Sequence, residues 1–289
     1  MSPTHLIQEI LARCLTEPPF LDRLIADGET ALTEYRLDAD TRAAFARTDL
    51  RRLRRFSGFI GKVQHNHLWD HFPATRLLLQ RYHIEIDVFA EYRAIQLSAE
   101  LRAEGSSEKI RRFASYLSRY AARKPELAGL HTAVRFERAC WELRQSMAAA
   151  ADRPAPGHLV DAPASLSWRA FQRGIPMPVG PLRIESFDCD PSRLVAAILN
   201  GTLSSNSRPR SRLFVLQLNP RNSLLKIMEV EELTALLLSA IDGQRNVRSI
   251  ISRIRRRALA ATPPLAFRSF FEQVAIADLI RFYGSPTCE

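Results

Sequence analysis

The histidines of the segment QHNHLWDH, residues 64–71, are the only clustered histidines in the sequence. On a helix, His67 and His71 would share one face because they are four residues apart, a spacing that metal ligands use. Asp70 could add a carboxylate, but no third ligand is placed by spacing, and His83 is merely near. We therefore expect no metal site in this chain. The remaining readings of these histidines are a helix face that contacts a partner and a polar core.

Motifs for the common kinds of catalysis are absent from the sequence. It contains no GxSxG, no phosphate-binding P-loop and no GxGxxG, and it has only 11 glycines with which to build a phosphate cradle. The four cysteines include no CxxC pair, which argues against a zinc knuckle or a disulfide framework. We predict that the chain is not an enzyme, has no catalytic residue and binds no cofactor of its own.

Net charge points to an anionic partner. The 289 residues include 41 basic and 31 acidic side chains, a net charge of +10, and residues 206–289 alone hold 13 basic and 7 acidic side chains. Such a balance favours nucleic acid, a membrane surface or an acidic peptide. Two arginine runs, 51–55 and 253–257, are either solvated helix faces or binding surfaces.

Hydropathy excludes a membrane-spanning helix, because no stretch approaches 18 consecutive apolar residues. The first residues also lack a basic start followed by an apolar core, so they do not form a secretory signal. We therefore expect a cytoplasmic protein that does not associate with a membrane.

Residues 1–151 contain the histidine segment and the first arginine run. They are predicted to form helices, since apolar residues recur there at intervals of three and four. One long helical segment starts at Asp49, a suitable N-cap, and continues to Trp69. Its core stripe is expected to consist of Leu50, Leu53, Phe56, Ile60, Val63 and Leu68. Further helices are expected over residues 73 onwards, 86–101, 108–122 and 125–151.

A linker follows at residues 152–165, where three prolines and one glycine fall within 14 residues. Beyond it, residues 166–171 are expected to be extended, 182–187 a strand and 192–199 a helix, while the three prolines of 174–181 exclude a regular helix there. Residues 213–218 and 224–230 predict a hairpin, followed by helices at 233–241, 247–258 and 267–280 and a short strand at 279–283. The fold class is therefore α+β, with a helical domain at 1–151 and an α+β domain at 166–289.

The C-terminal block, roughly residues 210–283, resembles a RiPP recognition element, the PqqD-like winged-helix fold that binds leader peptides of ribosomally made natural products. The resemblance is carried by LFVLQLNPRNSLLKIMEV, EELTALLLSAIDG, NVRSII and FRSFFEQVAIADLI. Within it, residues 238–243 with Val247 and Ile250 are similar to the family's short L..L.DG…V..I pattern.

The segment Leu50–Arg93 is similar to partner proteins of multinuclear non-haem iron-dependent oxidases, of which the methanobactin partner is one. It carries RRLRRFSGFIGKVQHNHLWDHFPATRLLL and FAEYR. The resemblance implies that the helical domain contacts the oxidase, that the oxidase holds the iron, and that the C-terminal domain binds the leader of a precursor peptide. The surface expected to contact the oxidase consists of Arg55, His67, Trp69, His71 and Phe72, because aromatics and arginine are favoured interface anchors.

The expected leader-binding groove lies between the strand Leu224–Val230 and the helix Phe267–Ile280, as the resemblance implies. Its residues are Leu225, Lys226, Ile227, Met228, Glu229, Phe267, Phe270, Phe271 and Val274. Alternation along the strand defines two faces, and the sequence does not decide which face lines the groove. The alternative function is a winged-helix DNA-binding regulator, with the arginine-rich helix 247–258 as its recognition helix. An apolar last helix beside a free strand favours the peptide over DNA, so nucleic acid is not the expected partner.

Overall fold

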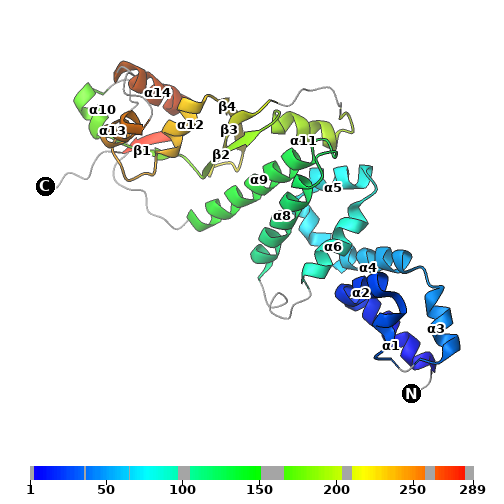
Figure 1. Cartoon of the computed structure of the whole chain (residues 1–289). Coiled ribbons are helices and arrows are strands. Elements are labelled where there is room, and N and C mark those ends of the chain that lie inside the picture. The colour runs from blue at the N-terminus through cyan, green and yellow to red at the C-terminus, as the bar shows by residue number, and fades with distance from the viewer. Residues whose placement is uncertain are drawn as a thin grey trace. The chain divides into compact units, whose positions relative to one another are not determined.

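The computed structural model describes residues 3–35, 37–64, 66–96, 105–150, 166–203, 210–257 and 264–283 (Figure 1). It contains many helices and two small antiparallel sheets, which confirms the α+β class. The chain divides into two compact units, the first Met1–Arg135 with Ile198–Thr202, and the second Phe136–Ala197 with Leu203–Glu289. No helix within the described ranges has the length and apolar character needed to cross a membrane.

The first unit is helical throughout its described part. Its elements are α1 (Pro3–Thr16), α2 (Pro18–Asp27), η1 (Gly28–Leu32), α3 (Ala39–Ala46), α4 (Leu50–Gln64), η2 (Asn66–His71), α5 (Pro73–Arg81), α6 (Glu85–Gln96), α8 (Ser106–Ala122) and the start of α9 (Leu130–Ala150). Local sequence explains several starts. Prolines occupy the first turns of α2 and α5, and the Asp49 carboxylate accepts the N–H of Arg52 at 3.0 Å, as predicted for an N-cap.

Aromatic side chains fill the centre of the first unit. The Phe113 ring lies 4.9 Å from Trp69, 5.7 Å from Phe72 and 4.9 Å from Tyr92, measured between ring centroids. These side chains are fully buried. Tyr116 extends the cluster and donates its hydroxyl to the carbonyl of Val88 at 3.1 Å. Edge-to-face packing of this kind adds to the free energy of plain burial.

A buried carboxylate joins three elements of the first unit. Glu85, at the start of α6, accepts from Lys62 of α4 at 2.7 Å, from Arg76 of α5 at 3.0 Å and from Gln80 of α5 at 3.1 Å. Its side chain is almost inaccessible to solvent. This polar cluster anchors α4 and α5 to the first turn of α6.

The second unit contains the last part of α9 and all of the strands. Its other elements are α10 (Trp168–Arg173), β1 (Ile175–Pro178), β2 (Leu182–Phe187), α11 (Pro191–Leu199), β3 (Arg212–Leu218), β4 (Leu225–Val230), α12 (Glu232–Ser239), α13 (Val247–Arg257), α14 (Pro264–Ile276) and β5 (Ile280–Tyr283). The order β3, β4, α12, α13, α14, β5 is the predicted one. β2, β3 and β4 form one antiparallel sheet, and β1 pairs with β5.

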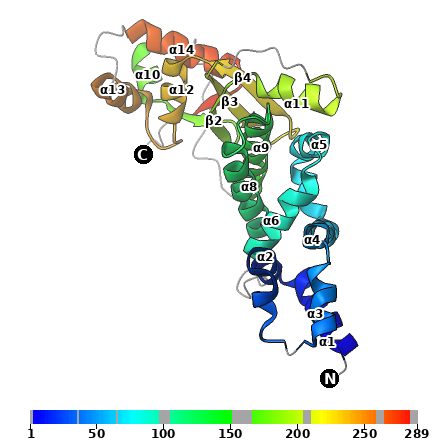
Figure 2. The same cartoon turned by 45° about the vertical axis from the view of Figure 1, so that its right-hand side comes forward.

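Each face of the three-stranded sheet is covered by helices. One face packs Phe187, Phe214, Leu216 and Leu218 against Phe136, Ala139, Cys140 and Leu143 of α9. Figure 2 shows the end of α9 beneath the strands. The other face contributes Val215 to a core formed with α10, α12, α13, α14 and β5. The boundary between the two units therefore falls within α9, between Arg135 and Phe136. The sequence predicts a later boundary, between a domain at 1–151 and a domain at 166–289. The predicted linker 152–165 lies outside the described residues.

The segment expected to be extended at 166–171 is helical instead. The Ser167 hydroxyl accepts the N–H of Ala170 at 3.3 Å and caps α10. Phe171 is then buried with its ring centroid 5.8 Å from Phe271 and 5.9 Å from Phe282. The expectation of a strand was wrong because a serine N-cap and a core contact outweigh the β propensity of this short run.

The reactivity of Cys14, Cys140 and Cys189 tests how deeply each thiol is buried. Desolvation raises the pKa of Cys14 to about 11 and that of Cys140 to about 12, so both remain protonated at neutral pH. Cys189 is only half-buried. At about pH 8 we expect iodoacetamide to alkylate Cys189 well before Cys14 and Cys140, because the thiolate is the reactive form. Peptide mapping by mass spectrometry measures the rates. A guanidinium-unfolded control should label all three, and equal rates in the native chain would contradict the burial.

Candidate functional site

Strand β4 lies at one edge of the three-stranded sheet. Among the described residues, β4 pairs with β3 on one side and with no strand on the other. Edge strands carry main-chain N–H and C=O groups that another extended chain can use. The strand that the sequence proposed for a peptide is therefore in a position to accept one.

The hairpin determines which β4 residues present these groups. The N–H of Asn219 donates to the carbonyl of Leu224 at 3.0 Å, so the odd-numbered residues of β3 direct their main chain toward β4. Gln217 lies opposite Lys226, and directions alternate along an antiparallel pair, so the even-numbered residues of β4 bond to β3. The residues that direct their N–H and C=O away from the sheet are Leu225, Ile227 and Glu229.

The side chains of β4 are divided between the two cores. Leu225 and Ile227 pack against the α9 face, whereas Met228 and Val230 pack against the helices that follow the sheet. These four residues are only partly buried. Since both faces of the sheet are covered, neither face of β4 lines an open groove. Glu229 is the one residue of β4 that is exposed.

Lys226 has a structural role that the sequence did not indicate. Its Nζ donates to the carbonyl of Ala277, just beyond the C-terminal end of α14, where a positive charge is favourable. Nearby, the buried Gln217 side chain donates to the carbonyl of Leu279 at 2.7 Å. These two hydrogen bonds connect the residues that follow α14 to β3 through Gln217 and to β4 through Lys226. Lys226 is therefore engaged within the fold.

Helix α14 directs three of its four predicted groove residues into the core. Phe267, Phe271 and Val274 recur on one helical face, and this face is buried against α10, α12, α13 and the β1–β5 pair. The expectation that these three side chains line a surface groove was wrong, because an apolar stripe at helical spacing is taken by the core. Phe270 is half-buried and is the one predicted aromatic that reaches the surface.

Two exposed apolar residues are close in sequence to the two partners of the Lys226–Ala277 contact. Ile276 at the end of α14 is 86% exposed, and Leu224 before β4 is 66% exposed. Ile276 is not among the residues predicted for the groove, and Leu224 is predicted only as the start of the strand. The sequence feature that could have indicated an exposed Leu224 is its position directly after the polar turn NPRNS. Ile276 could not be separated from the core stripe by spacing alone.

An open depression of about 460 Å³ lies at the opposite end of β4. It is lined by Arg210, Ser211, Arg212, Leu213, Glu229, Val230 and Glu232. Within it, Arg212 pairs with Glu229 at 3.2 Å across the strands. The β4 edge thus begins beside apolar side chains and ends beside charged ones.

The short DG pattern marks a turn and a core. Asp242 accepts the N–H groups of Gln244 and Arg245, both at 3.0 Å, and Gly243 has a positive φ of 72° that favours glycine. The hydrophobic positions of the pattern, among them Val247 and Ile250, are buried. These residues therefore build the unit and are not available to a ligand.

The surface predicted to contact an oxidase needs two corrections in the first unit. Trp69 and Phe72 are fully buried in the aromatic cluster, so they are not surface anchors. Trp69 lies within the turn η2 and Phe72 directly follows it, and both rings pack against Phe113. Arg55 is exposed, as expected, and pairs with Asp87 at 3.7 Å.

The predicted histidine pair is not on an α-helix. Residues Asn66–His71 form a 3₁₀ turn, in which side chains three residues apart are aligned and those four apart are not. His67 is exposed and His71 is half-buried. Within the described residues, no group of three or more His, Cys, Asp or Glu side chains could hold a metal ion.

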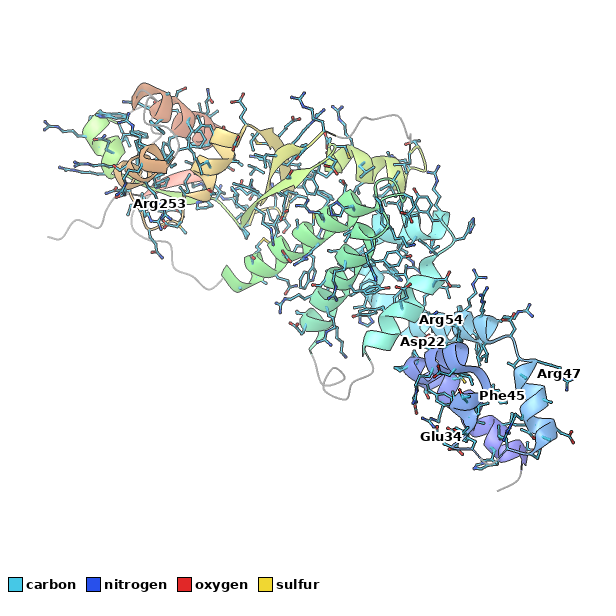
Figure 3. The ribbon with its side chains drawn as sticks, in the orientation of Figure 1. Asp22, Glu34, Phe45, Arg47, Arg54 and Arg253 are labelled. Carbon is cyan, nitrogen blue, oxygen red and sulfur yellow. The ribbon has the colours of Figure 1, made fainter. Side chains whose placement is uncertain are left out.

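Helix α13 carries the second arginine run. Val247, Ile250, Ile251 and Ile254 are buried, whereas Arg248 and Arg256 are exposed on the opposite face. Figure 3 labels Arg253 on the same helix. α10 packs beside α13 and adds the exposed Arg169 and Arg173. A basic surface thus exists in the second unit, separate from the residues predicted for the peptide.

Comparison with known proteins adds no relative to this description. Neither a protein-family model nor a curated protein matches the sequence.

Proposed function

We propose that the chain is a non-catalytic partner subunit that binds the leader of a ribosomally made precursor peptide. It presents the core of that peptide to a multinuclear non-haem iron-dependent oxidase for modification. In this proposal, β2–β3–β4 with α12–α14 is a winged-helix recognition element, and the helices of the first unit contact the oxidase. The iron belongs to the oxidase, and this chain needs no cofactor.

One observation carries the proposal: within the part of the chain that the structure describes, the outer main-chain edge of β4 pairs with no strand, and both faces of its sheet are covered. Residues 225, 227 and 229 direct three N–H and three C=O groups outward, by the alternation of the hairpin. A peptide that adds as a fourth strand gains affinity from these groups and specificity from side chains at either end. Leu224 and Ile276 provide apolar contacts at one end, and Arg210 and Arg212 lie at the other.

Charge supports a leader with acidic residues. Residues 206–289 hold 13 basic and 7 acidic side chains, so the second unit attracts anions at long range. Association with an acidic leader should therefore become slower as salt is added, because mobile ions screen charges beyond about 10 Å at 0.1 M ionic strength.

Glu229→Pro tests the edge with little damage to the sheet. The Glu229 N–H points away from β3, and the Glu229 side chain is exposed, so proline removes one outward donor and leaves the β3–β4 bonds in place. We expect binding of a fluorescent leader to weaken about fivefold, since a hydrogen bond contributes about 1 kcal/mol and each 1.4 kcal/mol is tenfold in affinity. Fluorescence anisotropy measures the affinity, and the probe is a synthetic peptide with the N-terminal sequence of a candidate precursor chosen from the short reading frames near the gene.

Glu229→Ala is the matched control, because it removes the same Arg212 ion pair and keeps the N–H. It should bind the leader within about twofold of the unchanged chain, since exposed ion pairs contribute little. Circular dichroism must show that both variants are folded. Equal binding by the proline and alanine variants would mean that the β4 edge does not hold the peptide.

A second candidate, a DNA-binding regulator, is favoured by the exposed arginines of α10 and α13. Arg and Ser side chains on one helix face, here Arg248, Ser249, Ser252 and Arg256, are common phosphate contacts. α14, by contrast, has a single arginine, and Arg268 is paired with Glu272 at 2.8 Å. Titration with duplex DNA separates the two functions. Tight DNA binding that Arg248→Ala and Arg256→Ala weaken, with no leader binding, would favour the regulator.

A further inference from the structure

Helix α4 buries small residues on one face and exposes three large apolar residues on another. Ser57 and Gly58 are buried, and Ser57 donates its hydroxyl to the carbonyl of Leu15 at 3.1 Å. A Cβ added at Gly58 would meet the carbonyl oxygen of Ile86 at 2.6 Å and the Cβ of Ala90 at 3.0 Å. α4 therefore lies so close to α6 that a side chain has no room between them.

The opposite face of α4 carries an apolar stripe. Phe56 is 52% exposed, Phe59 is 47% exposed and Val63 is 62% exposed. The rings of Phe56 and Phe59 stack with centroids 6.5 Å apart and planes 20° apart. With Arg52, these residues follow helical spacing and form one continuous line along the helix. We call Arg52, Phe56, Phe59 and Val63 the α4 ridge.

This arrangement overturns the expectation that Phe56 and Val63 belong to a buried stripe. Exposed apolar area is unfavourable at roughly 25 cal/mol per Å², and neighbouring aromatic rings form a patch of the kind that marks interaction sites. The patch is held by the close packing of Gly58, so it is a feature of the fold and not of one side-chain rotamer.

Charge indicates what kind of surface fits the ridge. α4 has five basic residues and no acidic one. Three of them have partners: Arg54 pairs with Asp22 at 3.4 Å, Arg55 with Asp87 and Lys62 with Glu85. Figure 3 labels Arg54 and Asp22 on the N-terminal helices. Arg51 and Arg52 are exposed and pair with no carboxylate of the described residues.

We propose that the α4 ridge docks into an apolar groove, rimmed by carboxylates, on the surface of the oxidase. This inference rests on the proposed function and names the surface through which the two proteins meet. Aromatic side chains and arginine are enriched at the cores of protein interfaces, whereas lysine is depleted there. A second copy of this chain is a poor occupant, because two ridges would bring their unpaired arginines together.

Phe56→Ala/Phe59→Ala is the variant that tests the ridge. Both side chains are exposed, so the double substitution should leave the circular dichroism spectrum and thermal midpoint nearly unchanged. We expect the affinity for a purified oxidase of the proposed class, chosen from the genes near that of this chain and measured by biolayer interferometry, to fall about thirtyfold or more. Arg52→Glu should also weaken the complex. Leu77→Ala, an exposed apolar substitution on α5, is the control and should bind like the unchanged chain.

The outcomes separate this inference from the proposed function. If the unchanged chain binds the oxidase and the double variant binds equally well, the ridge is not the interface, although the proposed function stands. If the unchanged chain does not bind the oxidase, both fail, whatever the leader-binding result. Light scattering that shows a dimer abolished by the double variant would assign the ridge to a second copy. Flotation with phosphatidylserine vesicles that requires Phe56 and Phe59 would assign it to a membrane, and either result overturns the proposal.

Discussion

Phe271→Ala is expected to lower the free energy of unfolding of the second unit by about 3–5 kcal/mol. Phe271 is completely buried, and its ring centroid lies 5.8 Å from Phe171, 5.2 Å from Phe270 and 6.0 Å from Phe282. Truncation leaves a cavity at the meeting point of α10, α14 and β5. Urea denaturation followed by circular dichroism and tryptophan fluorescence measures the change, and a chain of two units can show two transitions.

Phe270→Ala is the comparison for this experiment, because Phe270 is the neighbouring residue and only half-buried. Its effect on stability should be clearly smaller than that of Phe271→Ala. A Phe271→Ala variant that stays within about 1 kcal/mol of the unchanged chain but no longer binds the leader would contradict the structure. That pattern is the one a surface groove at Phe271 would produce.

Glu85→Ala is expected to destabilise the first unit by about 3 kcal/mol, within the range for breaking a buried ion pair. The substitution removes the acceptor for Lys62, Arg76 and Gln80 at once. Lys62 and Arg76 are partly exposed and can recover some hydration, which keeps the loss below the upper end of that range. Thermal and urea denaturation provide the measurement.

Asp87→Ala is the matched control in the same helical turn of α6. Asp87 pairs with Arg55 at 3.7 Å, and both side chains are about half exposed, so its loss should change stability by less than about 1 kcal/mol. Equal effects of the two substitutions would mean that burial does not distinguish the two carboxylates. A Glu85→Ala variant as stable as the unchanged chain would show that the cluster is not what joins α4, α5 and α6.

Local signals in the sequence predicted the order of elements well. The Asp49 cap, the prolines that open α2 and α5, and the hairpin before three helices all lie where short-range chemistry placed them. These features depend on neighbouring residues, so periodicity and capping rules reach them. The strand chosen for the peptide is also an edge strand, because it is the last strand of a meander whose next element is a helix.

Which face of an element is buried depended on partners far away in the sequence. Residues 56, 60 and 63 recur at helical spacing, and this pattern predicts a buried stripe. The structure instead buries Ser57 and Gly58, because only small residues allow α4 to approach the α6 backbone. In the same way, Trp69 is buried and not exposed because its ring packs against Phe113 of α8.

Short-range patterns were sufficient to predict the α+β class, the positions of most helices and strands, and Leu224–Val230 as a candidate binding strand. Three features depend on long-range packing: residues 225, 227 and 229 direct their main-chain groups away from β3, Phe267, Phe271 and Val274 are core, and Phe56, Phe59 and Val63 are surface. The reason is physical. Propensity and capping act over a few residues, whereas burial is set by whichever distant element reaches a given face first and fits it most closely.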